Sequence, residues 1–153
     1  MSAKFQKSLK IGQAWEERME VWMDEHFSGT KWDVVDTRDI YRDADGDQYP
    51  DYELVDIDSD QKCFIDAKKR NVYTIMHKKC FGFDEKLYRS YTNIANKYNS
   101  KTYVGFHDPV FDPDHVYILD VAQVPTFRVW FNNEHGQGAA YRWCIDDLLK
   151  YKL

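Results

Sequence analysis

Residues 49–70, YPDYELVDIDSDQKCFIDAKKR, hold the most informative pattern in the chain. An acid follows a proline at Asp51, a turn-like break falls at residues 58–60, and the triplet DAK places Asp66 and Lys68 two positions apart. Side chains on a strand alternate between its two faces, so Asp66 and Lys68 should point the same way. We therefore expect an anion and a cation side by side on one strand. Burying such a pair costs desolvation free energy, so a chemical role would explain why it is kept.

Two short runs in this stretch have strand character and flank the turn. DYELVDID at 51–58 and KCFIDAK at 62–68 read as strands, with DSDQ at 58–61 between them. An antiparallel hairpin brings the start of its first strand opposite the end of its second. We therefore predict that Asp51 lies beside Asp66 and Lys68, although 15 positions separate the two acids.

These residues resemble the core of the PD-(D/E)XK nuclease superfamily, which combines a Pro-Asp, a spacer of one hairpin and an Asp/Glu-x-Lys. The matching residues are Pro50, Asp51, Asp66, Ala67 and Lys68. The resemblance covers roughly residues 8–121. It implies an α/β fold with a restriction-endonuclease-like αβββαβ core, in which helices flank a central mixed β-sheet and a C-terminal β-hairpin and short helix are added.

The resemblance also implies a function: a metal-dependent deoxyribonuclease that hydrolyses DNA phosphodiester bonds, with junction-resolvase-like structure selectivity and a role in DNA recombination or repair as one form. The implied cofactor is Mg²⁺ or Mn²⁺. Its implied ligands are Glu16, Asp51, Asp66 and the backbone carbonyl of Ala67, and Lys68 completes the implied catalytic set. DNA is the implied partner, and a homodimer is the implied assembly.

The N-terminal part of the chain predicts an amphipathic helix over about residues 8–27. Trp15, Met19 and Met23 fall on one face at helical spacing, and Glu16 lies inside the same arc. The resemblance implies an inward Glu at the active site, and a Gly-x-x-x-Glu spacing like that ending at Glu16 is common in its junction-resolving branches. Glu20 is the other candidate for this active-site carboxylate. The alternative without a function is that Glu16 extends its carboxylate to solvent from the edge of the apolar face.

A basic segment follows the predicted acids. Between residues 62 and 79 the chain has six cations and only Asp66 as an acid. A phosphodiester substrate would require such a segment beside a carboxylate site, whereas a solvated loop without a partner is the alternative. The candidates for contacts with backbone phosphates are Lys69, Arg70, His77, Lys78 and Lys79.

The stretch DADGDQYPD at 43–51 suggests a competing function. Acids at 43, 45, 47 and 51 resemble a calcium-binding loop, so a calcium-stabilised module using Asp43, Asp45, Asp47 and Asp51 is an alternative. An EF-hand loop requires glycine where Gln48 stands and a bidentate Glu where Leu54 stands, so we favour a turn over residues 43–46. A non-catalytic nucleic-acid-binding protein of the same fold is a further alternative.

The remaining chain supplies the other predicted elements. A strand is expected over 32–41, a helix over 83–99, short strands over 102–106 and 115–121, a hairpin from 126–131 and 139–144, and a short helix from about 145.

Composition limits the protein class. The 153 residues are expected to form one domain, 1–153, and no apolar run approaches the roughly 20 residues that cross a membrane. Three cysteines without metal-ligand spacing predict reduced thiols in a cytoplasmic, reducing compartment. The net charge of −5 argues against a protein that coats nucleic acid, so any DNA contact must depend on local charge.

Overall fold

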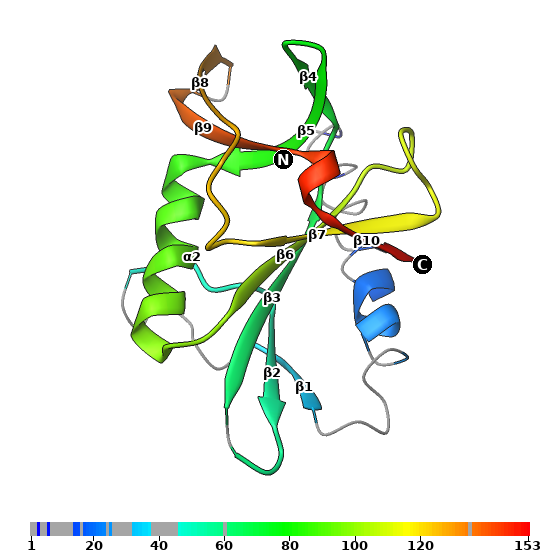
Figure 1. The fold of residues 1–153 in the computed structure, drawn as a ribbon, viewed down its shortest axis with the longest axis vertical. Coiled ribbons are helices and arrows are strands. Elements are labelled where there is room, and N and C mark those ends of the chain that lie inside the picture. Colours follow the sequence, from blue (N-terminus) through cyan, green and yellow to red (C-terminus); the bar gives the residue numbers. More distant parts are fainter. Residues whose placement is uncertain are drawn as a thin grey trace.

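The described part of the chain contains two β-sheets, an N-terminal helix, helix α2 (Glu85–Tyr98) and one 3₁₀ turn (Figure 1). The computed structural model describes residues 3, 6, 14, 15, 17–23, 25, 32–37, 46–59, 61–134 and 136–153. Within these residues, no helix is long and apolar enough to span a bilayer.

The larger sheet has six strands in the order β1-β2-β3-β6-β7-β10. Their bounds are β1 (Trp32–Asp36), β2 (Tyr52–Asp56), β3 (Lys62–Lys69), β6 (Thr102–His107), β7 (His115–Asp120) and β10 (Leu149–Lys152). The β3–β6 ladder is parallel and the other ladders of this sheet are antiparallel, so the sheet is mixed as predicted.

The hairpin predicted around residues 58–61 is confirmed. Strands β2 and β3 run antiparallel, with Tyr52 opposite Ile65 and Val55 opposite Lys62. The turn begins directly after β2, where the Asp56 carboxylate accepts hydrogen bonds from the backbone N–H groups of Asp58 and Ser59 at 2.9 and 3.4 Å. The open end of this hairpin is therefore the end that carries Asp51 and Asp66.

Helix α2 (Glu85–Tyr98) covers one face of the larger sheet. It begins where the Asp84 carboxylate accepts a hydrogen bond from the Leu87 N–H at 2.8 Å, and ends at Asn99 in the left-handed conformation. The buried side of α2 packs in a core that includes Phe106 of β6 and Leu119 of β7. These bounds match the predicted helix to within two residues.

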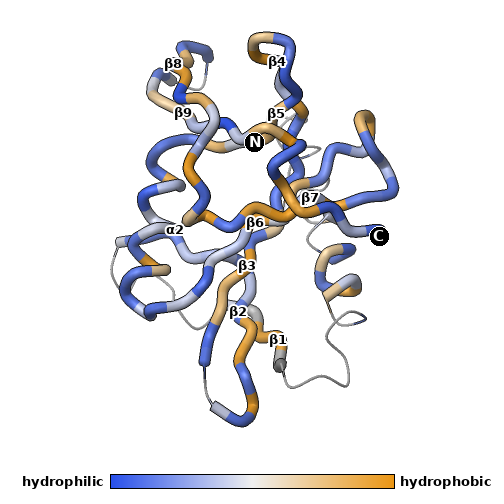
Figure 2. Tube along the Cα trace, viewed as in Figure 1, coloured by the Kyte–Doolittle hydropathy of each residue, from blue (hydrophilic) through white to orange (hydrophobic). Residues whose placement is uncertain are grey.

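The N-terminal helix packs on the opposite face. Trp15, Met19 and Met23 are buried there together with Ile65 and Ala67 of β3. This confirms, for the described residues, the predicted apolar face of the helix. Figure 2 shows hydrophobic residues along β6, in the middle of the molecule between the two helices, and hydrophilic residues at the turn of the β2–β3 hairpin.

A second sheet of four strands, in the order β4-β5-β9-β8, was not predicted as a unit. Its strands are β4 (Tyr73–Ile75), β5 (Lys78–Asp84), β8 (Phe127–Asn133) and β9 (Gly136–Cys144). No strand was predicted over residues 71–79, where the basic segment forms a hairpin closed by Met76 and His77, both at positive φ (48° and 67°) as a two-residue turn requires.

The C-terminal region corrects a second expectation. The predicted hairpin exists, and its strands extend farther than expected, leaving only residues 134 and 135 between them. The predicted short helix is a single 3₁₀ turn, η1 (Ile145–Asp147), because the chain immediately extends into β10 and pairs with β7.

Candidate active site at the open end of the β2–β3 hairpin

Asp51 and Asp66 interlock at the open end of the hairpin. The backbone N–H of Asp51 donates to Asp66 Oδ1 at 3.0 Å, and the N–H of Ala67 donates to Asp51 Oδ2 at 3.3 Å. This contact continues the ladder by one residue beyond the Tyr52–Ile65 pair. The predicted proximity of the two acids is confirmed.

Lys68 lies beside Asp66 on the same face of β3. Its Nζ is 3.0 Å from Asp66 Oδ2, and the side chain is 17% exposed while that of Asp66 is 1% exposed. The alternation of the strand produces this arrangement, with Ala67 turned to the opposite face, where the N-terminal helix packs. The anion and cation predicted from the DAK triplet are therefore paired, and the anion is the buried member.

Tyr91 of α2 completes the surroundings of Asp66, and it was not among the predicted site residues. Its hydroxyl donates to Asp66 Oδ2 at 2.5 Å. The signal was present in principle: Tyr91 stands at helical spacing with Leu87 and Ile94, which places it on the apolar face of the helix predicted over 83–99, and a buried phenol usually requires an acceptor. What the sequence does not specify is which acceptor α2 reaches when it docks on the sheet.

The charge state of this cluster follows from opposing effects. Burial raises the pKa of Asp66, but the positive charge of Lys68 and the hydrogen bonds around the carboxylate outweigh burial and hold the pKa below its usual range. Burial and the Asp66 carboxylate together raise the pKa of Tyr91 well above its usual range. Asp66 is therefore the hydrogen-bond acceptor and Tyr91 the donor.

The helix carboxylate implied at this site is not placed by the structure. Glu16 lies outside the described residues, and the rival Glu20 is exposed. Within the described part of the chain, no group of three or more His, Cys, Asp or Glu side chains is arranged to hold a metal ion. The acidic part of the candidate site is thus the pair Asp51 and Asp66.

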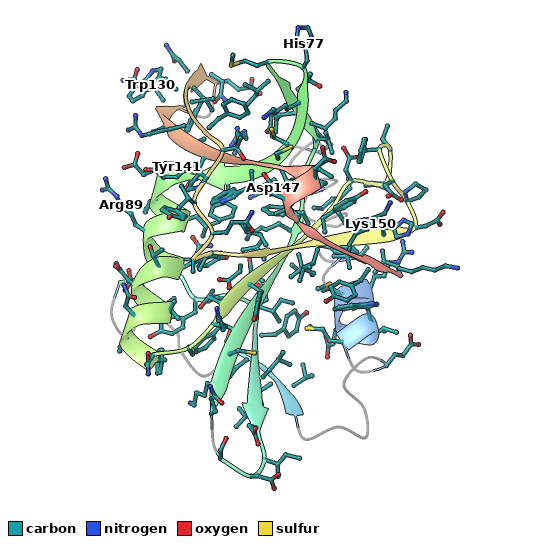
Figure 3. All side chains as sticks on the ribbon, in the orientation of Figure 1. His77, Arg89, Trp130, Tyr141, Asp147 and Lys150 are labelled. Carbon is teal, nitrogen blue, oxygen red and sulfur yellow. The ribbon has the colours of Figure 1, made fainter. Side chains whose placement is uncertain are left out.

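The basic candidates separate into two groups. Lys69 ends β3 and Arg70 follows it, with the Arg70 N–H donating to the His107 carbonyl at 3.1 Å, so both come within four positions of Asp66 in the chain. His77, Lys78 and Lys79 are exposed on the β4–β5 hairpin. Figure 3 shows His77 at the far end of that hairpin, next to the β8–β9 hairpin that carries Trp130.

The acids of the alternative calcium loop have different partners. Asp43 and Asp45 lie outside the described residues. Asp47 Oδ1 accepts a hydrogen bond from Asn93 of α2 at 3.4 Å, whereas Asp51 is engaged at Ala67. The calcium loop stays a prediction.

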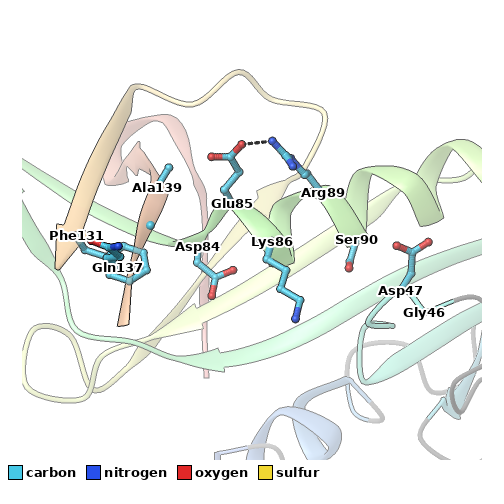
Figure 4. A pocket seen from close by; sticks show the side chains of 11 residues that line it. Gly46, Asp47, Asp84, Glu85, Lys86, Arg89, Ser90, Phe131, Gln137 and Ala139 are labelled. Atoms are coloured by element: carbon cyan, nitrogen blue, oxygen red, sulfur yellow. Dashed lines mark hydrogen bonds and ion pairs between the residues drawn. The ribbon is translucent and has the colours of Figure 1, made fainter. Parts of the chain in front are cut away.

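A hollow of about 610 Å³ opens elsewhere, between the start of α2 and the β8–β9 hairpin (Figure 4). Asp47, Asp84 and Glu85 contribute to its lining, and Glu85 pairs with Arg89 there. Neither Asp51 nor Asp66 lines it. Lys86 and Arg89 line it as well, so its charge is mixed, and we do not assign the candidate chemistry to a hollow that neither acid of the candidate site reaches.

Comparison with known proteins supports the fold. No model of a known protein family matches the chain, and no curated protein matches it either. Among solved structures, the chain is similar to Hjc, a Holliday junction resolvase from the archaeal hyperthermophile Archaeoglobus fulgidus. The TM-score is 0.55 at 11% sequence identity, and the match covers 91% of this chain and 90% of that chain.

The chain has a junction-resolvase-like fold. This similarity confirms the predicted restriction-endonuclease-like fold class and, at the level of the fold, the resemblance to the PD-(D/E)XK superfamily.

Proposed function

We propose that the protein is a metal-dependent deoxyribonuclease that hydrolyses DNA phosphodiester bonds, with a preference for branched DNA as in a junction resolvase. The observation that carries the proposal is the contact between Asp51 and Asp66 beside Lys68, in a fold similar to that of a Holliday junction resolvase. Two acids and a lysine gathered at one point are the groups that such a hydrolysis requires.

The donor set fits a hard divalent cation. Mg²⁺ binds oxygen ligands and commonly takes only one or two carboxylates from the protein, with waters and substrate phosphates filling the rest. Asp51 and Asp66 supply two carboxylates, joined through the 3.0 Å contact from the Asp51 N–H to Asp66 Oδ1. Mn²⁺ suits the same oxygen donors.

The backbone carbonyl of Ala67 is a reasonable third ligand. The N–H groups of Phe64 and Arg70 donate toward β6, so the even-numbered residues of β3 bond on that side and Ala67 bonds on the β2 side. A strand residue directs its N–H and C=O toward the same neighbour. Because the Ala67 N–H meets the Asp51 carboxylate, its carbonyl faces the same end of the hairpin. Glu16 is the proposed further ligand from the N-terminal helix.

A divalent cation, when bound, polarises the phosphate and lowers the pKa of a bound water. The protein's own residues prepare the site for it. Tyr91 and Lys68 keep the Asp66 carboxylate ionised and fix its orientation. Lys68 in turn has its ammonium held at 3.0 Å from Asp66, where it can stabilise the negative charge that develops on the phosphate.

The test is a cleavage assay with substitutions that preserve shape. Asp66→Asn and Lys68→Met should abolish cleavage of a panel of plasmid, single strand, linear duplex, flap and four-way junction with Mg²⁺ or Mn²⁺. The matched controls, Asp120→Asn and Lys101→Met, alter an exposed ion pair at 3.1 Å and should cleave like the wild type.

Several outcomes would count against the proposal. Undiminished cleavage by both site variants would show that Asp66 and Lys68 do not have the assigned catalytic roles. Cleavage in EDTA would show that the reaction needs no metal ion. DNA binding without cleavage of any substrate would favour the non-catalytic alternative. Light scattering of the free protein and its DNA complex tests the proposed homodimer.

A further inference from the structure

Arg142 of β9 is a buried cation that pairs with no acid in the part of the chain that the structure describes. It is 8% exposed, its Nη1 donates to the Tyr141 carbonyl at 3.1 Å, and its Nε is buried without a hydrogen-bond partner. Among the described residues, no carboxylate lies within ion-pair distance of it, whereas Arg89 and Arg128 both pair with Glu85. Burying an uncompensated charge is costly, so its position needs an explanation.

The second sheet is built to hold this side chain. Arg142 stands opposite Gly82 of β5. A Cβ at Gly82 would lie 2.0 Å from the Tyr141 carbonyl oxygen and 2.8 Å from Arg142 Cδ, so only glycine leaves room for the arginine to cross the strand. Beyond Gly82, the guanidinium carbon is 4.2 Å from the centre of the Tyr73 ring on β4. Gly82 and Tyr73 thus form a slot for the Arg142 side chain, and this slot orients the planar guanidinium at the side of β4.

Arg70 is a second arginine near the start of β4, and it is half-buried. It precedes Tyr73 by three residues, and its Nη1 donates to the Lys69 carbonyl at 3.3 Å. Burial is the largest effect on the pKa of Arg142 and lowers it, Tyr73 and Cys80 act in the opposite direction, and the positive charge of Arg70 again lowers the pKa, so a second cation acts on the same guanidinium. An anion bound between the two cations would remove their repulsion and use the free donors of both groups.

The position of Arg70 relative to Asp66 and Lys68 suggests which anion binds. Arg70 follows Lys68 by two residues, which is roughly 6.6 Å along an extended chain. That step is comparable with the spacing of neighbouring phosphates along one nucleic-acid strand. A strand whose scissile phosphate lies at Asp66 and Lys68 would therefore bring an adjacent phosphate to Arg70.

We propose that Arg70 and Arg142 together bind one backbone phosphate of DNA, next to the phosphate held by Asp51, Asp66 and Lys68. The DNA part of this inference rests on the proposed function. The anion site itself does not, because it follows from two arginines without acidic partners, one of them buried in a slot formed by Gly82 and Tyr73.

The anion site is tested first without DNA, by thermal unfolding in EDTA. Sodium phosphate, substituted for sodium chloride at matched ionic strength, should raise the Tm of the wild type. The Arg142→Met variant should lose more than half of this rise, and the Arg89→Met control should keep it. Without phosphate, Arg142→Met should melt at or above the wild-type Tm, because it removes an uncompensated charge; a purely structural arginine would instead give a lower Tm.

The DNA contact is tested next, by anisotropy of a labelled four-way junction in EDTA at several salt concentrations. Arg70→Met and Arg142→Met should each reduce the slope of log Kd against log salt by about 0.9, the value expected for one lost phosphate contact. If the two residues share one phosphate, the double variant should lose about the same amount as either single variant. A double loss equal to the sum would contradict the shared site.

The outcomes separate this inference from the proposed function. If no DNA is cleaved but Arg142→Met still loses the phosphate-dependent rise in Tm, the nuclease proposal fails and the anion site stands. If the wild type cleaves and Arg142→Met keeps the wild-type Tm rise and salt slope, the anion site is wrong. Should Arg142→Met not fold, the half-buried Arg70 decides the question: an Arg70→Met variant with a wild-type rise and slope overturns the site.

Discussion

Tyr91 and Asp66, 25 positions apart in the chain, share a buried hydrogen bond in which the phenol donates to the carboxylate at 2.5 Å. The bond joins the middle of α2 to the middle of β3, so the helix fixes the orientation of an acid that the hairpin alone would leave with Lys68 and the Asp51 N–H. The position of α2 therefore bears directly on the charge of the candidate site.

Removing the Tyr91 hydroxyl should destabilise the protein in a pH-dependent way. The neighbours of Asp66 lower its pKa below the usual value of 3.8, so its charge contributes stability above that pH, which is lost as the pH falls through the folded-state pKa. Tyr91→Phe should cost about 1.5–3 kcal/mol at pH 7, the range for a hydrogen bond to a charged group. Urea unfolding at pH 7 and pH 3 checks this, and an equal cost at both pH values would mean that the ring acts by packing alone.

Breaking the Asp66–Lys68 pair should cost more than breaking an exposed pair of similar geometry. Lys68→Ala leaves a buried carboxylate with fewer partners, and we expect a loss of about 2 kcal/mol. The Lys101–Asp120 pair has the same kind of contact at 3.1 Å, but Lys101 is 64% exposed, so Lys101→Ala should cause no measurable change. Urea unfolding of both variants makes the comparison, and equal losses would contradict the burial argument.

Divalent cations should stabilise the protein through Asp51. A ligand that binds only the folded state raises the Tm as its concentration rises. Asp51→Asn keeps an oxygen that can accept from the Ala67 N–H but loses the charge, so its Tm should respond little to Mg²⁺ while the Asp120→Asn control should respond like the wild type. The same rise in Tm in Asp51→Asn and in the wild type would show that the cation binds elsewhere.

Two glycines offer a matched test of close packing. A Cβ at Gly82 would lie 2.0 Å from a backbone oxygen, whereas a Cβ at Gly105 would lie 2.7 Å from the terminal methyl of Met19, the end of a flexible side chain. Gly82→Ala should therefore destabilise the protein by about 3 kcal/mol and Gly105→Ala by about 1 kcal/mol, within the range of overpacking costs. Chemical unfolding of both variants would reveal the difference, and the reverse order would contradict the described packing.

The elements that sequence reasoning predicted best are those defined by local pattern. The alternation in residues 51–58 and 62–68 predicted the hairpin. The helical spacing of Leu87, Tyr91 and Ile94 predicted α2. Because strand alternation and hairpin pairing are local rules, the proximity of Asp51 to Asp66 followed from them.

The missed elements depend on partners that are distant in the sequence. Strand β4 has only three residues and β5 begins with two lysines, so neither shows a long alternating run, and β5 becomes recognisable as a strand only through its pairing with β9. In the same way, β10 is a strand because β7 offers a free edge. Arg142 was missed for a related reason: its slot requires Gly82 and Tyr73, which lie about 60 or more positions earlier in the chain.

The parallel β3–β6 ladder has a consequence for the order of folding. More than thirty residues, including β4, β5 and α2, lie between the end of β3 and the start of β6, so this ladder closes a long loop before it gains any contact energy. The β2–β3 hairpin closes only a short one. We therefore expect Asp51 and Asp66 to meet early but to remain hydrated until α2 and β6 arrive. A partly folded chain would then present the basic end of β3 to DNA before it holds an organised acid pair, and it would bind without cutting.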